Sequence, residues 1–506
     1  MRKGKRLLSM LIGGALLTAS LSACSGNNGK NSAGGAPSAS ESGESSYVIT
    51  MAYPGNDPQD LQLVQDEMNK ILKGKIGATV KLLPISFGAW QQQLNLMLSS
   101  NEKLDIMTVQ SAEYATKVAK GQLVALDDLL ASNGQDILKA VNSSYLDATR
   151  IDGKIYAVPS IRDFAAGPGI LMRKDLVDKY HIDVNSIKTY EDLTAVFQTI
   201  KDNEPNITPL VPLNGGSTTL TFTDLMNTSD FDTLDDSIGI LPGLDNQLKV
   251  TNLFEDPMYE ERLNLVRQWY LNGFISKDAA TMTDSAVTLM GAGKAFAYLC
   301  RIKPGIESQE SASTGQQLVA VSFDQPVTQT SNITIIMQGI ASNSKNPEKA
   351  MQFLNLLYSD SDLLNLLDYG IEGKHYVTNS DNLIDYPEGV TSATNGYTNT
   401  GILFGNQLIS RVFKGNDPDI WNQLQQFNQN AKQSKALGFT FNVDPVKTES
   451  AAVQNVMNQF KGGLETGTLD PENTLPKFID KLKAAGLDKI IAEKQKQLDA
   501  WSQNHQ

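Results

Sequence analysis

The residue types that build most metal centres and nucleophilic active sites are scarce in this sequence. It has three histidines, His181, His375 and His505, and two cysteines, Cys24 and Cys300. A zinc site needs several clustered thiolates or imidazoles, so these scattered residues do not favour one. Cys300 lies in an apolar run, which is typical of an inert core thiol. We therefore predict no metal site and no cofactor.

Familiar catalytic motifs are present only as fragments. Gly291–Lys294 lacks the rest of a phosphate-binding loop, and Gly215–Ser217 lacks the trailing glycine of a nucleophile elbow. The acidic stretch Asp230–Asp236 has Leu234 where a calcium loop needs an oxygen ligand and Asp235 where it needs glycine. We interpret this stretch as a solvated loop. With 56 acidic residues, a pair of glycosidase carboxylates stays open as an alternative.

Aromatic and short polar residues recur at expected strand ends, in loops and on amphipathic helices. A sugar has an apolar ring face and a rim of hydroxyls, so its site needs an aromatic platform with polar groups around it. The candidate ligand-binding residues are Tyr53, Asn56, Trp90, Gln110, Asp163, Asn214, Trp269, Arg301, Glu372 and Tyr376. Trp90 and Trp269 also fit apolar stripes of helices, so core packing is the alternative interpretation for them.

The elements that must position these residues alternate between strand and helix in the first part of the chain. The pattern predicts strands at 47–53, 78–83 and 104–109, and helices at 61–72, 90–98, 113–120 and 123–130. This order favours right-handed strand–helix–strand units and a parallel sheet. Ligands of such sheets bind beyond the carboxyl ends of the strands, where Tyr53 and Gln110 lie.

A second block of elements begins near Ile161. Strands are predicted at 295–299 and 333–337, and helices at 190–200, 262–270 and 347–358, the last capped by Ser344 or Asn346. The tail from Leu475 onward has apolar residues at helical spacing. The fold class is therefore α/β.

The N-terminus has the layout of a secretory signal peptide. Four basic residues precede an apolar run over 7–17, which is shorter than the roughly 20 residues of a membrane span. Leu21–Cys24 then resembles the lipobox of bacterial lipoproteins, which implies cleavage after residue 23 and lipidation of Cys24. Residues 24–46 are rich in Gly, Ser and Asn and predict a flexible tether. We expect an exported chain that is attached to the membrane by its lipid.

Composition excludes some partners. The net charge is −13, which argues against a general nucleic-acid binder. Hydrophobic residues make up 41% of the chain, as in a globular protein.

Three short motifs carry a resemblance to a known family. They are Asp152–Pro159 (DGKIYAVP), Met290–Ala297 (MGAGKAFA) and Gly339–Ala350 (GIASNSKNPEKA). In this order, after a lipobox and tether, they resemble the carbohydrate-binding group of the extracellular solute-binding proteins of ABC importers. The resemblance covers roughly residues 47–375. The remainder resembles a Gram-positive lipoprotein subfamily with its own C-terminal region.

The resemblance implies a two-lobe, type II periplasmic-binding-protein-like fold with a hinge and an interlobe cleft. We expect lobe 1 to comprise 47–160 with 325–380, and lobe 2 to comprise 161–324 with 381–506, joined by crossings near 159–160 and 327–333. It implies a monomeric receptor, not an enzyme, on the outer face of the cell membrane. The receptor would capture a sugar or oligosaccharide by hinge closure and deliver it to ABC permease subunits. A secreted glycan hydrolase and a surface sensor or adhesion lipoprotein are the alternatives.

Overall fold

The computed structural model describes residues 46–100, 102–215 and 218–503, and the side chains of residues 214–220 are not among the described ones. The chain from Ser46 onward forms one compact unit. The predicted signal peptide, Cys24 and all but the last residue of the predicted tether lie outside the described residues.

The first sheet contains five strands in the order β2-β1-β3-β17-β6. These strands are β1 (Tyr47–Pro54), β2 (Ala78–Ile85), β3 (Ile106–Val109), β17 (Met337–Ile340) and β6 (Ala157–Pro159). β1 pairs in parallel with β2 and with β3, while β17 runs antiparallel to both β3 and β6. β6 therefore points the same way as β1–β3, and all four strands end at one edge of the sheet.

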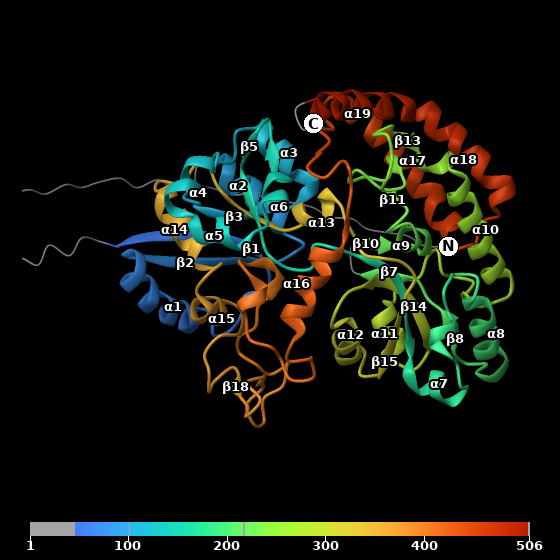
Figure 1. Cartoon of the computed structure of the whole chain (residues 1–506), viewed down its shortest axis with the longest axis horizontal. Helices are drawn as coiled ribbons and strands as arrows, with labels where there is room; N and C mark the ends of the chain where they lie inside the picture. Colours follow the sequence, from blue (N-terminus) through green and yellow to red (C-terminus); the bar gives the residue numbers. More distant parts are fainter. Residues whose placement is uncertain (1–45, 101, 216–217, 504–506) are drawn as a thin grey trace, which may run out of the picture. The chain divides into compact units, whose positions relative to one another are not determined.

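Helices cover both faces of this sheet (Figure 1). They include α1 (Leu61–Ile76), α2 (Trp90–Ser99), α3 (Ser111–Ala119), α4 (Asp127–Asn133), α14 (Pro347–Leu356) and α15 (Ser361–Tyr369). α1 buries Val64, Met68 and Leu72 at helical spacing and ends at Gly77, which takes the left-handed conformation with φ +61. Asn346 caps α14 by accepting a hydrogen bond from the backbone of Lys349, as one of the two predicted caps.

The second sheet has the order β15-β7-β14-β8. Its strands are β7 (Gly167–Arg173), β8 (Thr208–Leu210), β14 (Ala295–Ile302) and β15 (Leu318–Ser322). Around it lie α7 (Lys174–Lys179), α8 (Leu193–Asn203), α9 (Phe222–Met226), α10 (Pro257–Leu271), α11 (Ala286–Gly291) and α12 (Ile306–Thr314). Cys300 is buried in β14, as predicted.

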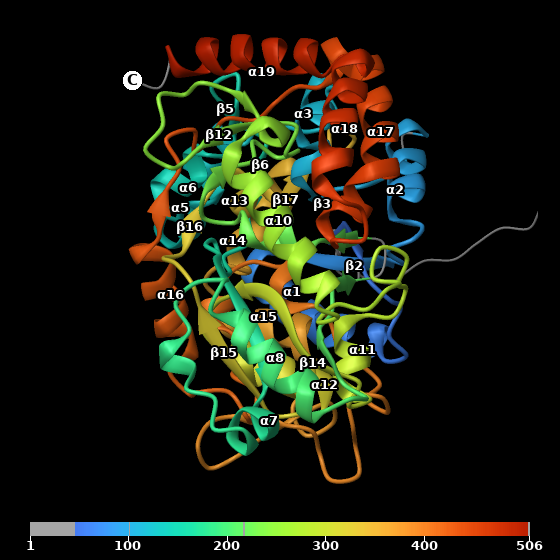
Figure 2. The same cartoon turned by 90° about the vertical axis from the view of Figure 1, so that its right-hand side faces the viewer.

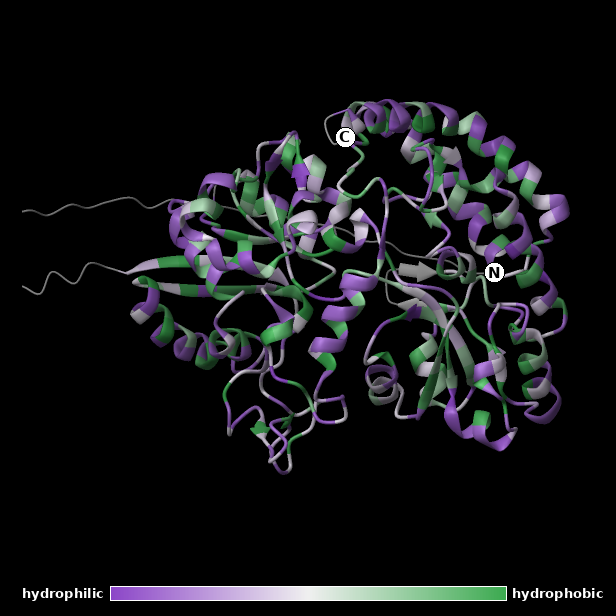
Figure 3. Ribbon diagram, viewed as in Figure 1, coloured by the Kyte–Doolittle hydropathy of each residue, from purple (hydrophilic) through white to green (hydrophobic). Residues whose placement is uncertain are grey.

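A small third sheet, β11-β12-β13, packs with the end of the chain. Its strands are β11 (Phe231–Asp232), β12 (Gly239–Pro242) and β13 (Thr251–Asn252), and the helices are α17 (Lys447–Glu465), α18 (Pro471–Ala485) and α19 (Leu487–Ser502). Figure 2 shows these three helices in red, with α19 running along the top. Hydrophobic residues concentrate in the strands of the sheets, whereas the terminal helices alternate hydrophobic and hydrophilic residues (Figure 3).

The remaining elements are short. They are α5 (Gln135–Ala140), α6 (Ser143–Asp147), β4 (Arg150–Ile151), β5 (Lys154–Ile155), β9 (Leu213–Gly215), β10 (Thr218–Leu220), β16 (Val327–Thr328), α13 (Thr330–Thr334), β18 (Val377–Thr378), β19 (Ile384–Asp385), α16 (Ile420–Asn430) and β20 (Lys432–Gln433). The chain passes from β6 into β7, and Ala166 bridges to Val327 where it returns. We call the part built on the first sheet the first lobe, and the part built on the second and third sheets the second lobe.

Three expectations about local structure are wrong. Residues 333–337 are not a strand, because the polar side chains of Gln329 and Asn332 form a capping box that starts α13, and β17 begins only at Met337. The helix expected at 123–130 begins only at Asp127. Residues 397–404, assigned to the second lobe, contribute Tyr397, Leu403 and Phe404 to the core of the first.

Candidate functional site

The shared edge of the first sheet presents polar and aromatic side chains to solvent. Asn56 is exposed just beyond β1, Phe87 is 64% exposed beyond β2, and Gln110 is half-buried beyond β3. The backbone N–H of Gly55 donates to the carbonyl of Ile85 at 2.8 Å, which joins the first two loops. Because the chain leaves the first lobe at this same edge, after Pro159, these loops lie on the side of the sheet where the second lobe begins.

The second lobe contributes the carboxyl end of β14. Arg301 there pairs in register with Pro168 of β7, close to the first chain crossing. A small cavity of about 60 Å³ at this place is lined by residues of both crossings and of β14, among them Arg162, Asp163, Arg301, Lys303 and Asn332. The candidate interlobe site is therefore the strand-edge group, Asn56, Phe87 and Gln110, together with this crossing group.

At the crossing, the Asp163 carboxylate has basic partners, whereas the Arg301 guanidinium has no ion pair with a described residue. The Asp163 carboxylate lies 2.7 Å from Arg162 and 3.3 Å from Lys303. Arg301 is exposed to solvent and has no hydrogen bond or ion pair with any described residue. Even so, surrounding protein desolvates its guanidinium, which lowers the pKa of Arg301. A cation that solvent reaches but protein partly encloses is a ready hydrogen-bond donor for a ligand.

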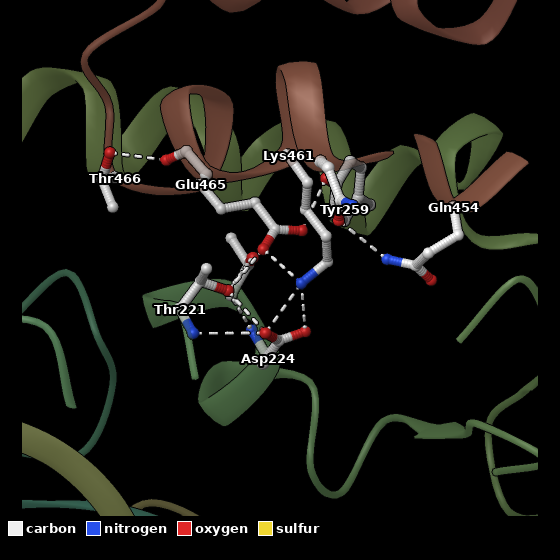
Figure 4. Close-up of polar contacts among 10 residues, drawn as sticks. Thr221, Asp224, Tyr259, Gln454, Lys461, Glu465 and Thr466 are labelled. Carbon is white, nitrogen blue, oxygen red and sulfur yellow. Dashed lines mark hydrogen bonds and ion pairs between the residues drawn. The ribbon is translucent and has the colours of Figure 1, made fainter. Parts of the chain in front are cut away.

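A polar network fixes the adjacent part of the second lobe to the C-terminal helices (Figure 4). Lys461 of α17 donates to both oxygens of Asp224 at 2.8 and 2.7 Å and lies 2.8 Å from Glu465. Tyr259 and Thr221 donate to the two oxygens of Glu465. Burial alone would raise the pKa of Asp224, but Lys461 outweighs it and the net pKa is lowered. α9 and the turn before it are thus anchored by the end of the chain.

Three predicted aromatic ligand contacts lie in the core instead. Tyr53 is fully buried, with its ring edge-on to Phe404 at 5.0 Å and its hydroxyl accepting a hydrogen bond from Asn399 at 3.3 Å. Trp269 is fully buried and donates to Thr194 at 2.9 Å. Trp90, the first residue of α2, is 3% exposed and packs against the first sheet. Core packing, the alternative interpretation of the two tryptophans, is therefore correct for both. Tyr53, which was predicted as a ligand contact, is a core residue as well.

Glu372 and Tyr376 flank two residues that contact the loop after β1: Lys374 and His375 each lie 3.1 Å from Asp60. The exposed Glu372 accepts a hydrogen bond from Thr378 at 2.5 Å. Tyr376 is 6% exposed and packs against Tyr369 with ring centroids 6.4 Å apart. Both residues stay predictions.

Asn214 cannot be placed in the same detail. Its backbone pairs with Thr219 in the β9–β10 hairpin, at the edge of the second sheet, and its side chain lies outside the described part. It therefore stays a prediction, as do Asn56, Gln110, Asp163 and Arg301, which the fold does bring to the two facing edges.

Sequence reasoning missed Phe87, Arg162 and Lys303. Phe87 stands directly before Gly88 in a short strand-to-helix loop, and this position was a usable signal of exposure. Arg162 and Lys303 gave no such signal, because nothing in the local sequence shows that both meet Asp163.

The acidic stretch 230–236 is less solvated than expected. Asp232 is 3% exposed and accepts hydrogen bonds from Ser434 and from the backbone of Leu234. Asp236 pairs with Lys494. Asp235 itself is exposed to solvent. Protein donors thus already occupy several of these carboxylates, and the described residues hold no cluster of metal-ligating groups.

Comparison with known proteins gives two matches along the chain. Residues 62–362 match the bacterial extracellular solute-binding protein family, and residues 435–503 match a domain of unknown function, DUF3502. A carbohydrate ABC transporter substrate-binding protein of Streptococcus pneumoniae serotype 4 is 31% identical over 96% of each chain.

Solved structures agree with this result. The N-glycan transport solute binding protein of S. pneumoniae is 28% identical, with a TM-score of 0.81 over 91% of this chain and 100% of that one. Its complexes with Man1GlcNAc and Man5GlcNAc give TM-scores of 0.72 and 0.70 at the same identity, over 90% and 91% of this chain and 99% of each complex chain. An alginate-binding protein solved without calcium, 18% identical, shares the fold with a TM-score of 0.62 over 90% of this chain and 98% of its own.

Proposed function

Because this chain belongs to the bacterial extracellular solute-binding protein family, we propose that it captures an oligosaccharide between its lobes and delivers it to an ABC permease. The predicted family and α/β fold are confirmed, and the family places it among binding proteins and not among enzymes. The observation that supports the proposal is that exposed Phe87 and Asn56 and half-buried Gln110 lie at the sheet edge where the chain crosses to the second lobe, and that Arg301 of the second lobe is exposed close to the same crossing.

The site has the chemistry that a sugar requires. Phe87 offers an exposed aromatic face for the apolar side of a pyranose. The Asn56 and Gln110 amides can each donate and accept, and the Arg301 guanidinium supplies donors that form no hydrogen bond with a described residue. Asp163 adds an acceptor whose position is held by Arg162 and Lys303.

The N-glycan transport relative supports closure of the lobes around the ligand. One protein, at one sequence identity, gives TM-scores of 0.81, 0.72 and 0.70 in three structures, and the two lower values belong to glycan complexes. The lower TM-scores of the two complexes support a conformation that differs when a glycan is bound. A ligand that contacts both lobes binds the closed arrangement better and shifts the equilibrium toward it.

The chain is extracellular by family. Within the described residues, no helix is long and apolar enough to cross a membrane. We assign attachment to a lipid on Cys24, on the grounds of the lipobox Leu21–Cys24. Two acyl chains would hold the protein stably, where one alone binds only marginally.

Titration calorimetry with Man1GlcNAc, Man5GlcNAc and a panel of other neutral oligosaccharides tests this function. We expect at least one glycan to bind, to be recovered intact, and to lower the radius of gyration measured by small-angle scattering. Absence of binding across the panel would refute the proposal, and release of shorter sugars would favour the hydrolase. Scattering profiles that are identical with and without saturating ligand would argue against closure.

A further inference from the structure

A second, larger cavity lies between the first lobe and the C-terminal region. Its volume is about 980 Å³, at the upper end of the range usual for small-molecule sites. One wall is formed by α3, the β4–β5 hairpin and Tyr156, and the other by residues 438–445 and the last turns of α19. We call it the α3–α19 cavity. We propose that it binds the outer sugars of a longer or branched neutral oligosaccharide whose inner end occupies the interlobe site. This proposal rests on the proposed function.

The lining has aromatic surface and uncommitted polar groups. Tyr156 and Trp501 are half-buried, and both line the cavity. The Tyr156 hydroxyl and the exposed Asp152 carboxylate have no hydrogen bond to any described residue. The Thr440 hydroxyl also has no partner in the described part of the chain, but it is shielded from solvent and therefore from a ligand in the cavity. The Tyr156 hydroxyl and the Asp152 carboxylate are the groups to which sugar hydroxyls can bind.

Another polar side chain in the lining, Gln497, is already hydrogen-bonded within the protein. Gln497 of α19 accepts from the backbone N–H of Asn442 at 2.9 Å and donates to its carbonyl at 3.0 Å. Gln497 also donates to Glu493 at 2.9 Å. These bonds hold residues 440–445 against α19, so the wall that carries Thr440 is preorganised.

α3 runs from Gln110 of the interlobe site to the cavity. This helix begins directly after Gln110, and Ala112, Ala115 and Ala119 lie on one of its faces. The last two line the cavity, and their small side chains leave room beside the helix. From Ser111 to Ala119 the helix rises about 12 Å, so a chain of sugars can follow it from one site to the other.

The two walls belong to different lobes. α3 is part of the first lobe, and α19 packs with the third sheet of the second. A ligand that touches both walls stabilises the arrangement in which they face each other. The C-terminal region, residues 435–503, would therefore select for ligand length.

The test compares Man1GlcNAc with Man5GlcNAc, and its main variant is Ala119→Trp. Ala119 is exposed on α3, so the larger ring fills the cavity without disturbing the core. We expect Ala119→Trp to weaken Man5GlcNAc binding by about tenfold or more and to leave Man1GlcNAc within about twofold, as judged by titration calorimetry. The matched control is Ala131→Trp, at an exposed position on α4 outside the cavity.

A second variant separates binding from folding. Tyr156→Phe removes only a hydroxyl that has no hydrogen bond to a described residue, so the melting temperature should hold while Man5GlcNAc affinity falls. Equal effects on both glycans, or no effect of either variant, would overturn the cavity proposal alone. If the unsubstituted protein binds neither glycan, the cavity proposal fails, and so does the idea that N-glycans are the ligands of this protein.

Discussion

The side chain of Asn428 holds the backbone of Phe164 at the first chain crossing. Its Oδ1 accepts a hydrogen bond from the Phe164 N–H at 2.8 Å, and its Nδ2 donates to the carbonyl of Arg162 at 2.7 Å. Asn428 lies on α16 and is 6% exposed. One buried amide thus fixes the segment that carries Arg162 and Asp163, 264 residues earlier in the chain.

Asn428→Ala should therefore destabilise the fold. Two backbone groups at the crossing would lose their partners, which costs about 2–4 kcal/mol of unfolding free energy. Urea denaturation measures the loss, with Gln426→Ala, exposed on the same helix, as the control. Equal stability of the two variants would show that water replaces the amide without cost.

Replacing Arg301 should affect binding and spare stability. Because the guanidinium has no partner among the described residues, Arg301→Gln removes no internal bond. A lost hydrogen bond to a charged donor costs about 1.5–3 kcal/mol, which is roughly a ten- to hundredfold fall in glycan affinity. Calorimetry beside melting curves checks this, with exposed Lys188→Gln as control. An Arg301→Gln protein that binds normally would remove this residue from the site.

Phe87 and Tyr53 should give opposite results. Phe87→Ala removes a side chain that is 64% exposed, so it should weaken glycan binding and leave the melting temperature nearly unchanged. Tyr53→Ala empties a fully buried position against Phe404 and should cost about 3–5 kcal/mol of stability. If Phe87→Ala melts early and binds normally, the aromatic platform must lie elsewhere.

Asp368 should make stability depend on pH. It is fully buried, neither carboxylate oxygen has a partner in the described structure, and burial raises the pKa well above its usual value. The folded state therefore keeps a proton that the unfolded chain releases above about pH 3.9. Stability from this group is full below that pH and is lost as pH rises toward the folded pKa.

Asp368→Asn removes this titration. The variant should melt higher than the parent at neutral pH, and the gap should close as pH falls toward 4. Melting curves across this range measure the effect, and Asp128→Asn, exposed on α4, is the control. A gap that does not change with pH would mean that Asp368 stays ionised with an unseen partner such as water.

Cys24 should decide membrane attachment. Cys24→Ala removes the thiol that the lipobox offers for acylation, so the protein should leave the detergent phase in a partition experiment. Cys300→Ala is the matched control, since that thiol is buried in β14. Retention of the Cys24→Ala protein in the detergent phase would rule out this anchor.

Local sequence was enough for β1 and α1 of the first lobe. The apolar run at 47–53 and the spacing of Val64, Met68 and Leu72 identify these elements, because each pattern matches the period of its own element. It was insufficient at 333–337, where a run of mostly apolar residues resembled a strand although the capping box of Gln329 and Asn332 starts a helix.

By itself the sequence determined the α/β alternation and the family, and it predicted the export leader. These depend on residues close together or on motifs in order, which no tertiary contact can alter. Only the tertiary structure decided which strand-end aromatic residue is exposed. Tyr53 lies near the end of β1 and Phe87 just beyond β2, yet Phe404 and Asn399 fold back more than 300 residues later to cover Tyr53. Burial is set by such distant partners, and nothing within a few residues of Tyr53 or Phe87 specifies them.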